Sequence, residues 1–547
     1  MVTFPRDQNQ SNQEKATMND NQCIKENTII NTYGGDFSVN WSEDSKISPR
    51  GYWLHYATYL STTKLLDDLA DSCPLDYRSN NAPTKKEILF TLLVAVTDGM
   101  KRYNHISALS NEQYLAKILN IKKLRSADSV RRAIKRMDIT AARIWLESAM
   151  LRFFEPLLAE SYVLDLDPTV KPLAGRQEGT EKSFNPKRKG HPANWIHTFV
   201  VSKLRLVLYA ELHAGNEGNG TFSLPGLEYL LGLLPKNLHP SLVRGDVGFG
   251  NERIMNFLED QNLRYLFKLR TSPGVKKTIH ELLLNGKWEA VPDTRWEGCR
   301  TSIRLRDWTK ERQIVIYRRV LFVKNDKDIT VESSAAEQLD LFQLQSETLS
   351  DYEHYEWIVL ITDFNAPLCE LLQLYNDRAD CENNFDELKN QFGWGGFTSH
   401  ELATSNIMMQ LVSLFYNWLN IFLRLGTPDG NDDQYTEKNV KSGKSTKTPA
   451  HRERISIKND LLNVMGRISN HGGRNIVALT VLSANGERIK LFFDRIAEFL
   501  SSLQSTAPQL DHLDKWTLIL SKVLDVFLDS KHLHTVSKNN QFILGFL

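Results

Sequence analysis

The alternation of apolar and polar residues divides the chain into a helical part and a part in which strands and helices alternate. Between about 50 and 150, apolar residues recur with the spacing of helices, as in Lys86–Val96. Further on, short runs rich in β-branched residues take over. Tyr162–Asp167 is typical of a strand that ends in acids, and Trp195–Val201 with Leu204–Glu211 is typical of a hairpin. We therefore expect a helical region followed by an α/β domain.

The order of the elements limits the folds that the α/β part can adopt. After the hairpin come a helix near Gly226–Leu234, a strand at Leu242–Asp246, a helix at about Asn251–Gln261 and a strand at Leu263–Leu269. Three strands, a helix, a strand, a helix and a strand is the order of an RNase H-like core, a mixed sheet with flanking helices. The first and fourth strands are neighbours in that fold, and here both end in an aspartate. We expect these two carboxylates to meet.

Changes in composition mark the other parts of the chain. Residues 288–324 are rich in strand-forming residues and interrupt the α/β pattern, and two polar stretches are typical of a loop and a linker. A hairpin is expected around Asn485-Gly486, and the tail from about 513 has a helical, amphipathic pattern. The predicted parts are a flexible N-terminal segment (1–45), a helical domain (46–155), the first part of the core (156–285), a β-rich insertion (286–355), the last part of the core (356–425), a linker (426–455) and a C-terminal region (456–547).

Composition and charge exclude several classes of protein. At 547 residues the chain is long enough for roughly three or four domain-sized units. Its 67 Lys and Arg residues balance 66 Asp and Glu, so any nucleic-acid binding must rest on local basic patches. The five cysteines include no C-x-x-C pair, which argues against a disulfide framework and a thiolate zinc site. With no secretory signal and no apolar run of about 18 residues, we expect a cytoplasmic protein with no membrane contact.

One segment, Tyr375–Lys389, carries an unusual set of side chains. Read as a helix, it places Tyr375, Arg378, Glu382 and Lys389 within an arc of about 60°, along nearly four turns. A row of this kind suits an anionic substrate held beside a metal ion. The alternative is a solvated face with charge pairs three or four residues apart, the usual meaning of mixed charges on a helix. Acids elsewhere in the chain favour the first interpretation.

Three carboxylates, Asp167, Asp246 and Glu382, would form a site of hard oxygen ligands. Without His or Cys, such a set prefers Mg²⁺ to zinc, and Mn²⁺ can take its place. Two such ions about 4 Å apart can hold the attacking and leaving oxygens of a phosphodiester. Asp386 lies near the same helix face, so spacing alone leaves it open as the third ligand. Glu387 lies on another face and fits less well.

The spacing Tyr-x2-Arg-x3-Glu-x6-Lys resembles, at every interval, a large group of bacterial insertion-sequence transposases of the DDE type. Asp167-Pro-Thr is similar to the Asp-x-Thr around their first acid, and Arg-Gly-Asp246-Val-Gly-Phe is similar to the segment around the second. Residues 171–190 resemble the loop that follows the first acid. The resemblance covers about 160–425.

The resemblance implies a concrete function. Asp167, Asp246 and Glu382 would hold two Mg²⁺ ions on an RNase H-like core, and the enzyme would nick and join double-stranded DNA at the ends of a mobile element. Such enzymes carry a strand-rich domain between the second and third acids, where 288–355 lies here. They act as homodimers in a synaptic complex, which by analogy gives the C-terminal region a part in dimerisation. A bacterial, nucleoid-associated protein is then expected.

Further residues are expected to contact DNA. Arg378 and Lys389 suit phosphates, and Tyr375 suits a base or a phosphate. The helix near 129–137 has a basic face and follows a helical pair, as in helix-turn-helix readers, although an ordinary solvated face has the same pattern. In related enzymes a Trp of the inserted domain stacks on a flipped base, although a Trp among strands is more often core. The candidates on these elements and on the loop after the first acid are Arg131, Arg132, Lys135, Lys182, Lys187, Arg188, Lys189, Trp296 and Trp308.

Two nearby acids, Asp165 and Asp167, allow more than one interpretation. They alternate on one strand and share a face, so either can be the first ligand, and the Asp-x-Thr position favours Asp167. Asp165-Leu-Asp-Pro-Thr also fits the nucleophile motif of haloacid dehalogenase-like phosphatases. Their metal motif needs another acid shortly after the position of Asp246, and Val247–Asn251 contains none. A non-catalytic, domesticated DNA-binding derivative and a general RNase H-like nuclease are two further possible functions.

Overall fold

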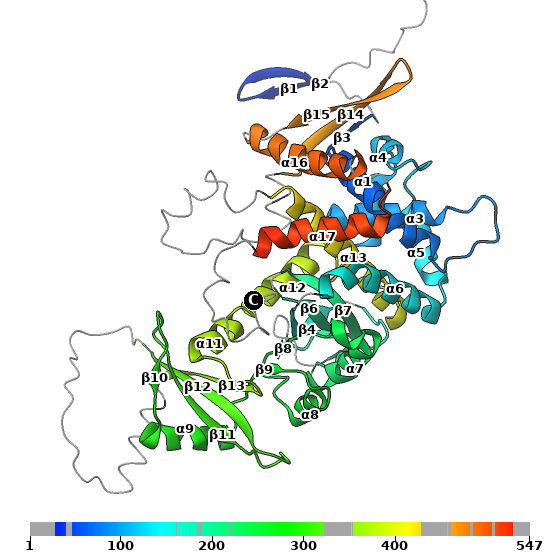
Figure 1. Cartoon of the computed structure of the whole chain (residues 1–547). Helices are drawn as coiled ribbons and strands as arrows, with labels where there is room; N and C mark the ends of the chain where they lie inside the picture. Colours follow the sequence, from blue (N-terminus) through cyan, green and yellow to red (C-terminus); the bar gives the residue numbers. More distant parts are fainter. Residues whose placement is uncertain are drawn as a thin grey trace, which may run out of the picture.

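The computed structural model shows a mixed α/β protein, as the sequence predicts (Figure 1). A large mixed sheet is flanked by helices, and helices from early and late parts of the chain gather beside one end of it. The structure describes residues 28–39, 46–159, 161–173, 175–182, 189–202, 204–218, 220–321, 352, 354–427, 457, 461–481, 485–505 and 509–528.

Five strands form the core of the sheet in the order β7–β6–β4–β8–β9. They are β4 (Val163–Pro172), β6 (Pro192–Val201), β7 (Leu206–His213), β8 (Leu242–Gly245) and β9 (Tyr265–Lys268). β4, β6 and β7 pair antiparallel, whereas β8 pairs parallel with both β4 and β9. Helix α7 (Leu224–Leu233) precedes β8, and α8 (Glu252–Asp260) precedes β9. The element order predicted for an RNase H-like core is confirmed.

The strands of the predicted insertion continue the same sheet. They are β10 (Glu289–Ala290), β11 (Glu297–Ile303) and β12 (Arg312–Val320), and they follow α9 (Pro273–Asn285). The next strand, β13 (Tyr355–Thr362), begins the predicted last part of the core. β13 pairs antiparallel with β9, and β12 and β11 follow outward. The insertion is therefore joined to the core by backbone hydrogen bonds. The polar loop predicted within it falls mostly on residues 322–350, outside the described residues.

The predicted helical domain is a set of short and medium helices. They are α1 (Trp53–Thr63), α2 (Leu65–Asp71), α3 (Lys85–Thr97), η1 (Tyr103–Leu109), α4 (Gln113–Ile118), α5 (Ala127–Arg136) and α6 (Ile139–Leu158). Helix α3 begins with a full capping box, in which Thr84 and Glu87 satisfy each other's backbone N–H groups. Residues 28–39, within the segment predicted to be flexible, form the hairpin of β1 (Thr28–Thr32) and β2 (Gly35–Val39).

The C-terminal region packs against these first helices. Helices α16 (Gly486–Ser505) and α17 (His512–Leu528) contact α1, and the Trp516 indole N–H donates to the Phe153 carbonyl at 3.1 Å. Strand β14 (Val464–His471) pairs with β15 (Arg474–Val481) and with β3 (Ile47–Ser48). The hairpin predicted at Asn485-Gly486 was wrong. The turn falls at Gly472-Gly473, and Gly486 begins a helix.

Helix α13 (Leu402–Leu425) joins the sheet to the helices. It lies along the edge strand β7, and its amide side chains bond to the outer backbone of that strand. Asn417 accepts from the Val207 N–H and donates to the Val207 carbonyl, both at 2.9 Å. An exposed strand edge invites unwanted pairing, so these bonds close the sheet on this side. No helix in the described part of the chain has both the length and the apolar composition needed to cross a bilayer.

Candidate active site

The candidate acids Asp167 and Asp246 are neighbours across two parallel strands. The β4–β8 register ends with Leu166 opposite Gly245, and each acid is the next residue of its own segment. The prediction that the strand ends at Asp167 was wrong, because β4 continues to Pro172 through its pairing with β6. Only the parallel β4–β8 ladder ends just before Asp167. The carboxyl end of that ladder brings the two acids together.

A tight turn holds Asp246 at the end of β8. Its Oδ1 accepts a hydrogen bond from the Gly248 N–H at 3.0 Å, and its carbonyl accepts from the Phe249 N–H at 3.1 Å. The Phe249 ring folds back over Gly245, where an added Cβ would lie 2.7 Å from a ring carbon. The Arg-Gly-Asp-Val-Gly-Phe sequence is therefore explained by a turn that leaves Asp246 half-buried.

Asp165 lies on the same face of β4 as Asp167, but it belongs to a buried ion pair. Arg244 Nε donates to Asp165 Oδ1 at 2.5 Å, and Arg244 Nη2 donates to Oδ2 at 2.7 Å. The two residues are 2% and 1% exposed. Because a phosphatase nucleophile must reach its substrate, this geometry does not suit the phosphatase interpretation.

The segment with the charged row consists of two helices. Helix α11 (Leu368–Asn376) ends just after Tyr375, and α12 (Ala379–Gln391) begins just after Arg378. Between them the backbone stays right-handed, and the Arg378 N–H bonds to the Tyr375 carbonyl three residues earlier at 3.1 Å. The prediction of one continuous helix was wrong by this one tightened turn. Tyr375 is half-buried against the core cluster that contains Leu374.

Two contacts dock α12 onto β4. Arg378 Nη1 lies 3.5 Å from Asp167 Oδ2, with both side chains 12% exposed, and Lys389 Nζ donates to Thr169 Oγ1 at 2.6 Å. Glu382 lies on α12 between these contacts, about one turn after Arg378. The side chain of Glu382 lies outside the described part of the structure. Two members of the predicted row, Arg378 and Lys389, thus lie against the strand that carries Asp167.

The other acids of α12 differ in burial. Asp386 is exposed, and its Oδ1 accepts from the Asn390 side chain at 2.6 Å. Glu387 is 2% exposed and lies among buried polar residues that include Arg424. Glu387 therefore faces the protein interior behind α12, on a different side from Lys389 and its contact with β4.

Lys171 extends the polar row of β4 beyond Thr169. It is 1% exposed, and its Nζ donates to the Gly396 carbonyl at 3.1 Å. Burial lowers the pKa of Lys171 to about 8. A Cβ at Gly396 would lie 1.6 Å from the Lys101 carbonyl oxygen, so this close approach requires glycine. Lys171 thereby holds the segment after α12 against β4.

Comparison with known proteins identifies the family. A family model described as "Transposase DDE domain group 1" matches residues 57–441, which is more than half of the chain. The chain belongs to this family of DDE transposases. No curated protein matches the chain. Among solved structures, a piggyBac transposase in a synaptic complex with hairpin DNA is similar at 11% identity and a TM-score of 0.34, over 88% of this chain and 86% of that one.

The carboxylates of this DDE transposase supply oxygen ligands only. Asp167 and Asp246 each directly follow the last pair of the β4–β8 register, and Glu382 lies on α12, which contacts β4. Among the side chains that the structure describes, no three carboxylate, imidazole or thiol groups gather as a metal would require. The Glu382 side chain is not among those described. The type of the three donors fits Mg²⁺ or Mn²⁺.

The two candidate tryptophans for base stacking are buried. Trp296 is 9% exposed and Trp308 is 7% exposed, and each belongs to a hydrophobic core cluster. The Arg319 guanidinium lies 4.7 Å from the centre of the Trp296 ring, and that of Arg312 lies 5.3 Å from the Trp308 ring. This burial is at odds with the stacking prediction, because a base must reach an open ring face.

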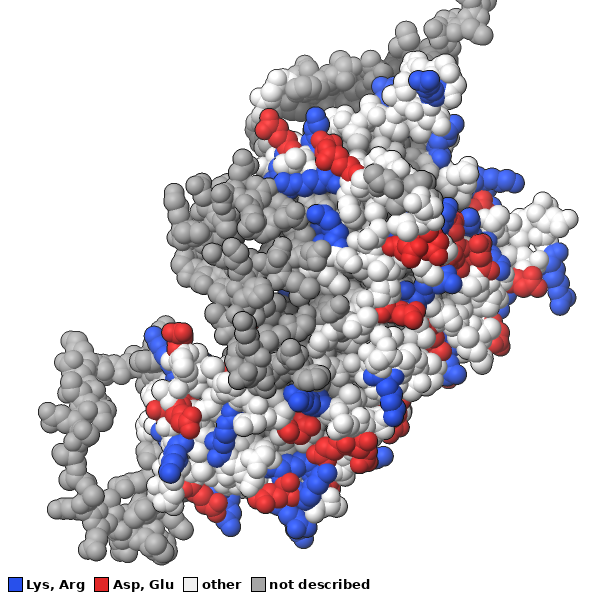
Figure 2. All heavy atoms as spheres, viewed as in Figure 1, with Lys and Arg blue, Asp and Glu red and all other residues white. Residues whose placement is uncertain are grey.

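The basic candidates on α5 are exposed as predicted. Its buried side is apolar, and Arg131, Arg132 and Lys135 lie on the outside. Arg131 contacts Asp128 at 3.1 Å, and Lys135 contacts Glu401 at 2.9 Å. Of the loop candidates, Lys182 and Lys189 are exposed, whereas Lys187 and Arg188 lie outside the described residues. In the view of Figure 2, basic and acidic residues are interspersed over the described surface, as the balanced composition predicts.

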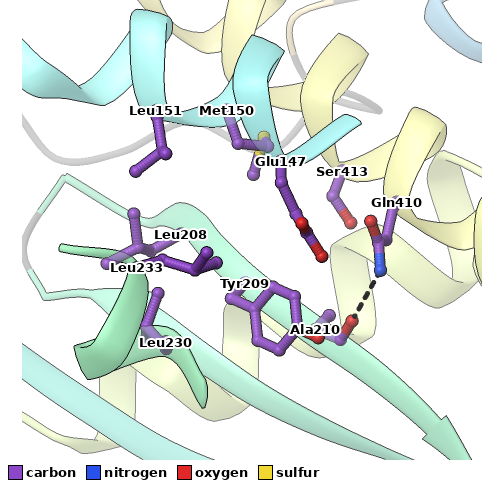
Figure 3. Close-up of a pocket in the computed structure, with 10 residues that line it drawn as sticks. All are labelled: Glu147, Met150, Leu151, Leu208, Tyr209, Ala210, Leu230, Leu233, Gln410 and Ser413. Atoms are coloured by element: carbon purple, nitrogen blue, oxygen red, sulfur yellow. Dashed lines mark hydrogen bonds between the residues drawn. The ribbon is translucent and has the colours of Figure 1, made fainter. Parts of the chain in front are cut away.

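A small cavity between α6, α7, β7 and α13 lies apart from these acids (Figure 3). Apolar side chains form most of its wall. Its one carboxylate, Glu147, accepts from the Tyr229 hydroxyl at 2.6 Å and lies 3.5 Å from Arg143 Nε. A site for DNA phosphates needs cationic or donor groups, so this cavity does not suit one.

Sequence reasoning placed Thr169 and Arg244 in the motifs around the two acids, but it gave neither of them, nor Lys171, a role in the site. Thr169 and Lys171 follow Asp167 at two-residue spacing, so the strand period places them on one face. That signal was present, but it required β4 to continue past Asp167. The partner of Arg244 could not be read from spacing, because the two strands meet only after long connections.

Proposed function

We propose that this protein is a DDE transposase that binds the ends of an insertion sequence and catalyses Mg²⁺-dependent DNA cleavage and strand transfer. One observation carries the proposal. The β4–β8 register makes Asp167 and Asp246 neighbours, and the helix of Glu382 is docked on that strand by contacts on both sides of Glu382. This arrangement supports a site formed by three acids from distant parts of the chain.

Asp167, Asp246 and Glu382 would hold the metal. When bound, two divalent ions would neutralise charge on the scissile phosphate and favour the deprotonated form of the attacking hydroxyl or water. The protein's part is to fix the oxygen donors before DNA arrives. The hydrogen bond from Gly248 restrains Asp246, and the β4 ladders on both sides restrain the backbone of Asp167.

Arg378 and Lys389 would bind DNA phosphates beside these acids, with Tyr375 at the entrance. A guanidinium can grip a phosphate with two parallel hydrogen bonds, whereas an ammonium acts as a point charge. In the structure Arg378 contacts Asp167 and Lys389 contacts Thr169, so one cation lies at a candidate acid and the other two residues further along β4. They need only exchange or share partners to meet a phosphate there.

Double-stranded DNA is the proposed partner, both as inverted-repeat ends and as target. The exposed basic face of α5, with Arg131, Arg132 and Lys135, would contact the backbone of the element ends. The loop that contains Lys189 would add contacts near the acids. We propose a homodimer in the synaptic complex, and a bacterial nucleoid as the place where it acts.

A cleavage assay tests the function. The substrate is a linear duplex that carries the DNA flanking the reading frame, with Mg²⁺ or EDTA. The wild type is expected to nick the repeat ends only with Mg²⁺ and to join them to a plasmid. Asp167→Asn, Asp246→Asn and Glu382→Gln should each lose at least about 10³-fold in rate. Asp386→Asn, an exposed change on the same helix, is the matched control and should cleave normally.

The remaining outcomes separate the competing functions. Cleavage without joining indicates an RNase H-like nuclease. Specific binding of the ends without cleavage indicates a domesticated DNA-binding protein. If Asp386→Asn loses activity and Glu382→Gln retains it, Asp386 is the third acid instead.

A further inference from the structure

The buried guanidinium of Arg244 contacts three separate elements around the candidate acids. On β4, it binds both carboxylate oxygens of Asp165. Next to β6, Nη2 donates to Ser202 Oγ at 2.7 Å. On α11, Nη1 donates to the carbonyl oxygen of Leu374. One planar group, itself on β8, therefore joins two strands, the end of a third and a helix.

Each of these contacts lies close in sequence to a residue of the proposed site. Asp165 precedes Asp167 by two residues and shares its face of β4, and Arg244 precedes Asp246 by two residues. Leu374 is adjacent to Tyr375, in the last turn of α11. The spacing is the same on both segments because Asp165 and Arg244 are register partners, each two residues before its acid.

We propose that Arg244 and Asp165 are positioning residues that set the distances between the three metal-holding segments. This inference rests on the proposed function, because it assigns the ion pair a role in that site. The planar guanidinium of Arg244 bonds to its partners in fixed directions, and so it sets the positions of β4, β8 and α11 relative to one another. A shift of any one element would separate Asp167, Asp246 and the helix of Glu382.

A contribution to stability alone would not explain why the pair is ionic. Buried ion pairs are often no more stabilising than apolar side chains of similar size, because both charges lose their hydration. Their geometric specificity is the distinguishing property, since Arg bonds to carboxylates and carbonyls in fixed directions. This pair is placed where specificity matters for chemistry.

The chain offers a matched control for such a clamp. Arg312 on β12 is 5% exposed and bonds to two carboxylates of α8, Glu259 at 3.0 Å and Glu252 at 3.1 Å. It also donates to Asn256 at 2.5 Å. Arg312 therefore resembles Arg244 in burial and bonding, but its partners are on α8 and not on the segments of the proposed site.

The test compares Arg244→Lys, Asp165→Asn and Arg312→Lys in the full chain. Lysine keeps the charge but removes the fork, so each arginine variant should lower Tm to a similar degree. Only Arg244→Lys and Asp165→Asn should weaken Mn²⁺ binding, measured by calorimetry without DNA, by about 10-fold or more. Hydrogen exchange should rise in 165–172, 244–248 and 371–378 for Arg244→Lys, and around α8 and β12 for Arg312→Lys.

The outcomes distinguish this proposal from the proposed function. If Arg244→Lys lowers Tm but leaves Mn²⁺ affinity and exchange in the three segments unchanged, the positioning role is wrong. If Arg312→Lys weakens Mn²⁺ binding equally, the effect is general destabilisation and the proposal also fails. If the wild type binds Mn²⁺ yet cleaves no DNA, the transposase proposal fails, while exchange and affinity still judge the clamp.

Discussion

Two buried polar clusters lie on opposite faces of the same sheet, and they are assembled in different ways. The site face of β4 carries Asp167, Thr169 and Lys171, which contact residues of the α11–α13 segment. The other face carries a histidine cluster centred on His197 and His213. The strand register separates them, because Asp167 lies opposite Thr198 while His197 lies opposite Pro168.

The histidine cluster is satisfied by its own neighbours. His197 bonds to Ser223 Oγ and to the Glu217 carbonyl, the latter at 2.7 Å. His213 bonds to Glu217 at 3.1 Å and to Glu211 at 3.2 Å. These partners are at most 26 residues apart, all between β6 and η2 (Gly220–Ser223). The cluster therefore stabilises one local part of the fold, from β6 to η2.

The site face differs because its contacts join distant parts of the chain. Lys389 and Thr169 are 220 residues apart, and Lys171 and Gly396 are 225 apart. Their geometry is set only when β4, β8 and α12 have assembled. We conclude that buried polar groups alone do not indicate function here. Polar groups that join separate elements and bring opposite charges together are a better indication of function. Polar groups whose hydrogen bonds are all satisfied by neighbours in sequence are a poorer one.

The largest expected effect falls on the site face. Asp167→Asn keeps the size of the side chain but removes a charged oxygen ligand, so cleavage should fall by at least about 10³-fold. Its contact with Arg378 joins two side chains that are each 12% exposed, so the free energy of unfolding should also fall, by roughly 1–3 kcal/mol. Cleavage rate and urea unfolding of the same preparation measure both. If Asp167→Asn is strongly destabilised but keeps the wild-type cleavage rate per folded molecule, the site face has the structural role that we assign to the histidine face.

On the histidine face the effect should be on stability. His197→Leu leaves Ser223 Oγ and the Glu217 carbonyl without a partner in a region where His197 itself is 0% exposed. The free energy of unfolding should fall by about 2–4 kcal/mol, with the cleavage rate per folded molecule unchanged. Ser223→Ala, which removes only one bond, serves as the milder control. Loss of cleavage in a folded His197→Leu protein would assign this face a catalytic role.

The sequence predicted the core elements and the candidate acids, but it missed how they are joined. Strand and helix periods located β6, β7, α7, β8 and α8, because these signals are local. The extension of β4 past Asp167 was missed because it depends on pairing with β6. The ion pair of Arg244 with Asp165 likewise depends on a parallel register.

A local signal also misled in one place. Asn485-Gly486 is a favoured hairpin turn, yet Gly486 starts α16, because the preceding strand pairs backward through Gly472-Gly473. Trp296 and Trp308 each belong to a hydrophobic cluster beside an arginine, and their stacking on a base stays a prediction.

The histidine cluster should make stability depend on pH in the acid range. Burial and the neighbouring His213 lower the pKa of His197 to about 4. The folded protein therefore binds that proton more weakly than the unfolded chain, and stability falls as pH drops below about 6.5. Between pH 7.5 and pH 5 this group should cost about 2 kcal/mol of unfolding free energy.

His213 contributes with the opposite sign. Burial lowers its pKa, but its hydrogen bonds with Glu211 and Glu217 and their charges raise it above the usual value. Its stabilising effect is complete below about pH 6.5 and is lost as pH rises through the raised pKa. Urea unfolding from pH 4.5 to 8.5 measures both slopes. His197→Gln should flatten the acid slope, and an unchanged acid slope would show that other groups cause it.

The smallest expected effect, Lys171→Met, sharpens the comparison because it should stabilise. The Lys171 ammonium is 1% exposed, and burial lowers its pKa to about 8. Below that pH the lysine is charged in the folded state as well, so the full cost of burying the charge destabilises the fold. Methionine fills similar space without the charge, and it loses only one bond, to the Gly396 carbonyl. The free energy of unfolding should rise by about 1 kcal/mol at pH 7, and by less at pH 9.5, where the lysine is largely neutral when folded.

A site face held for function tolerates such a cost, so cleavage by Lys171→Met should fall while stability rises. If stability drops at pH 7 by as much as in His197→Leu, Lys171 is a structural group like the histidines, and the two faces differ less than proposed.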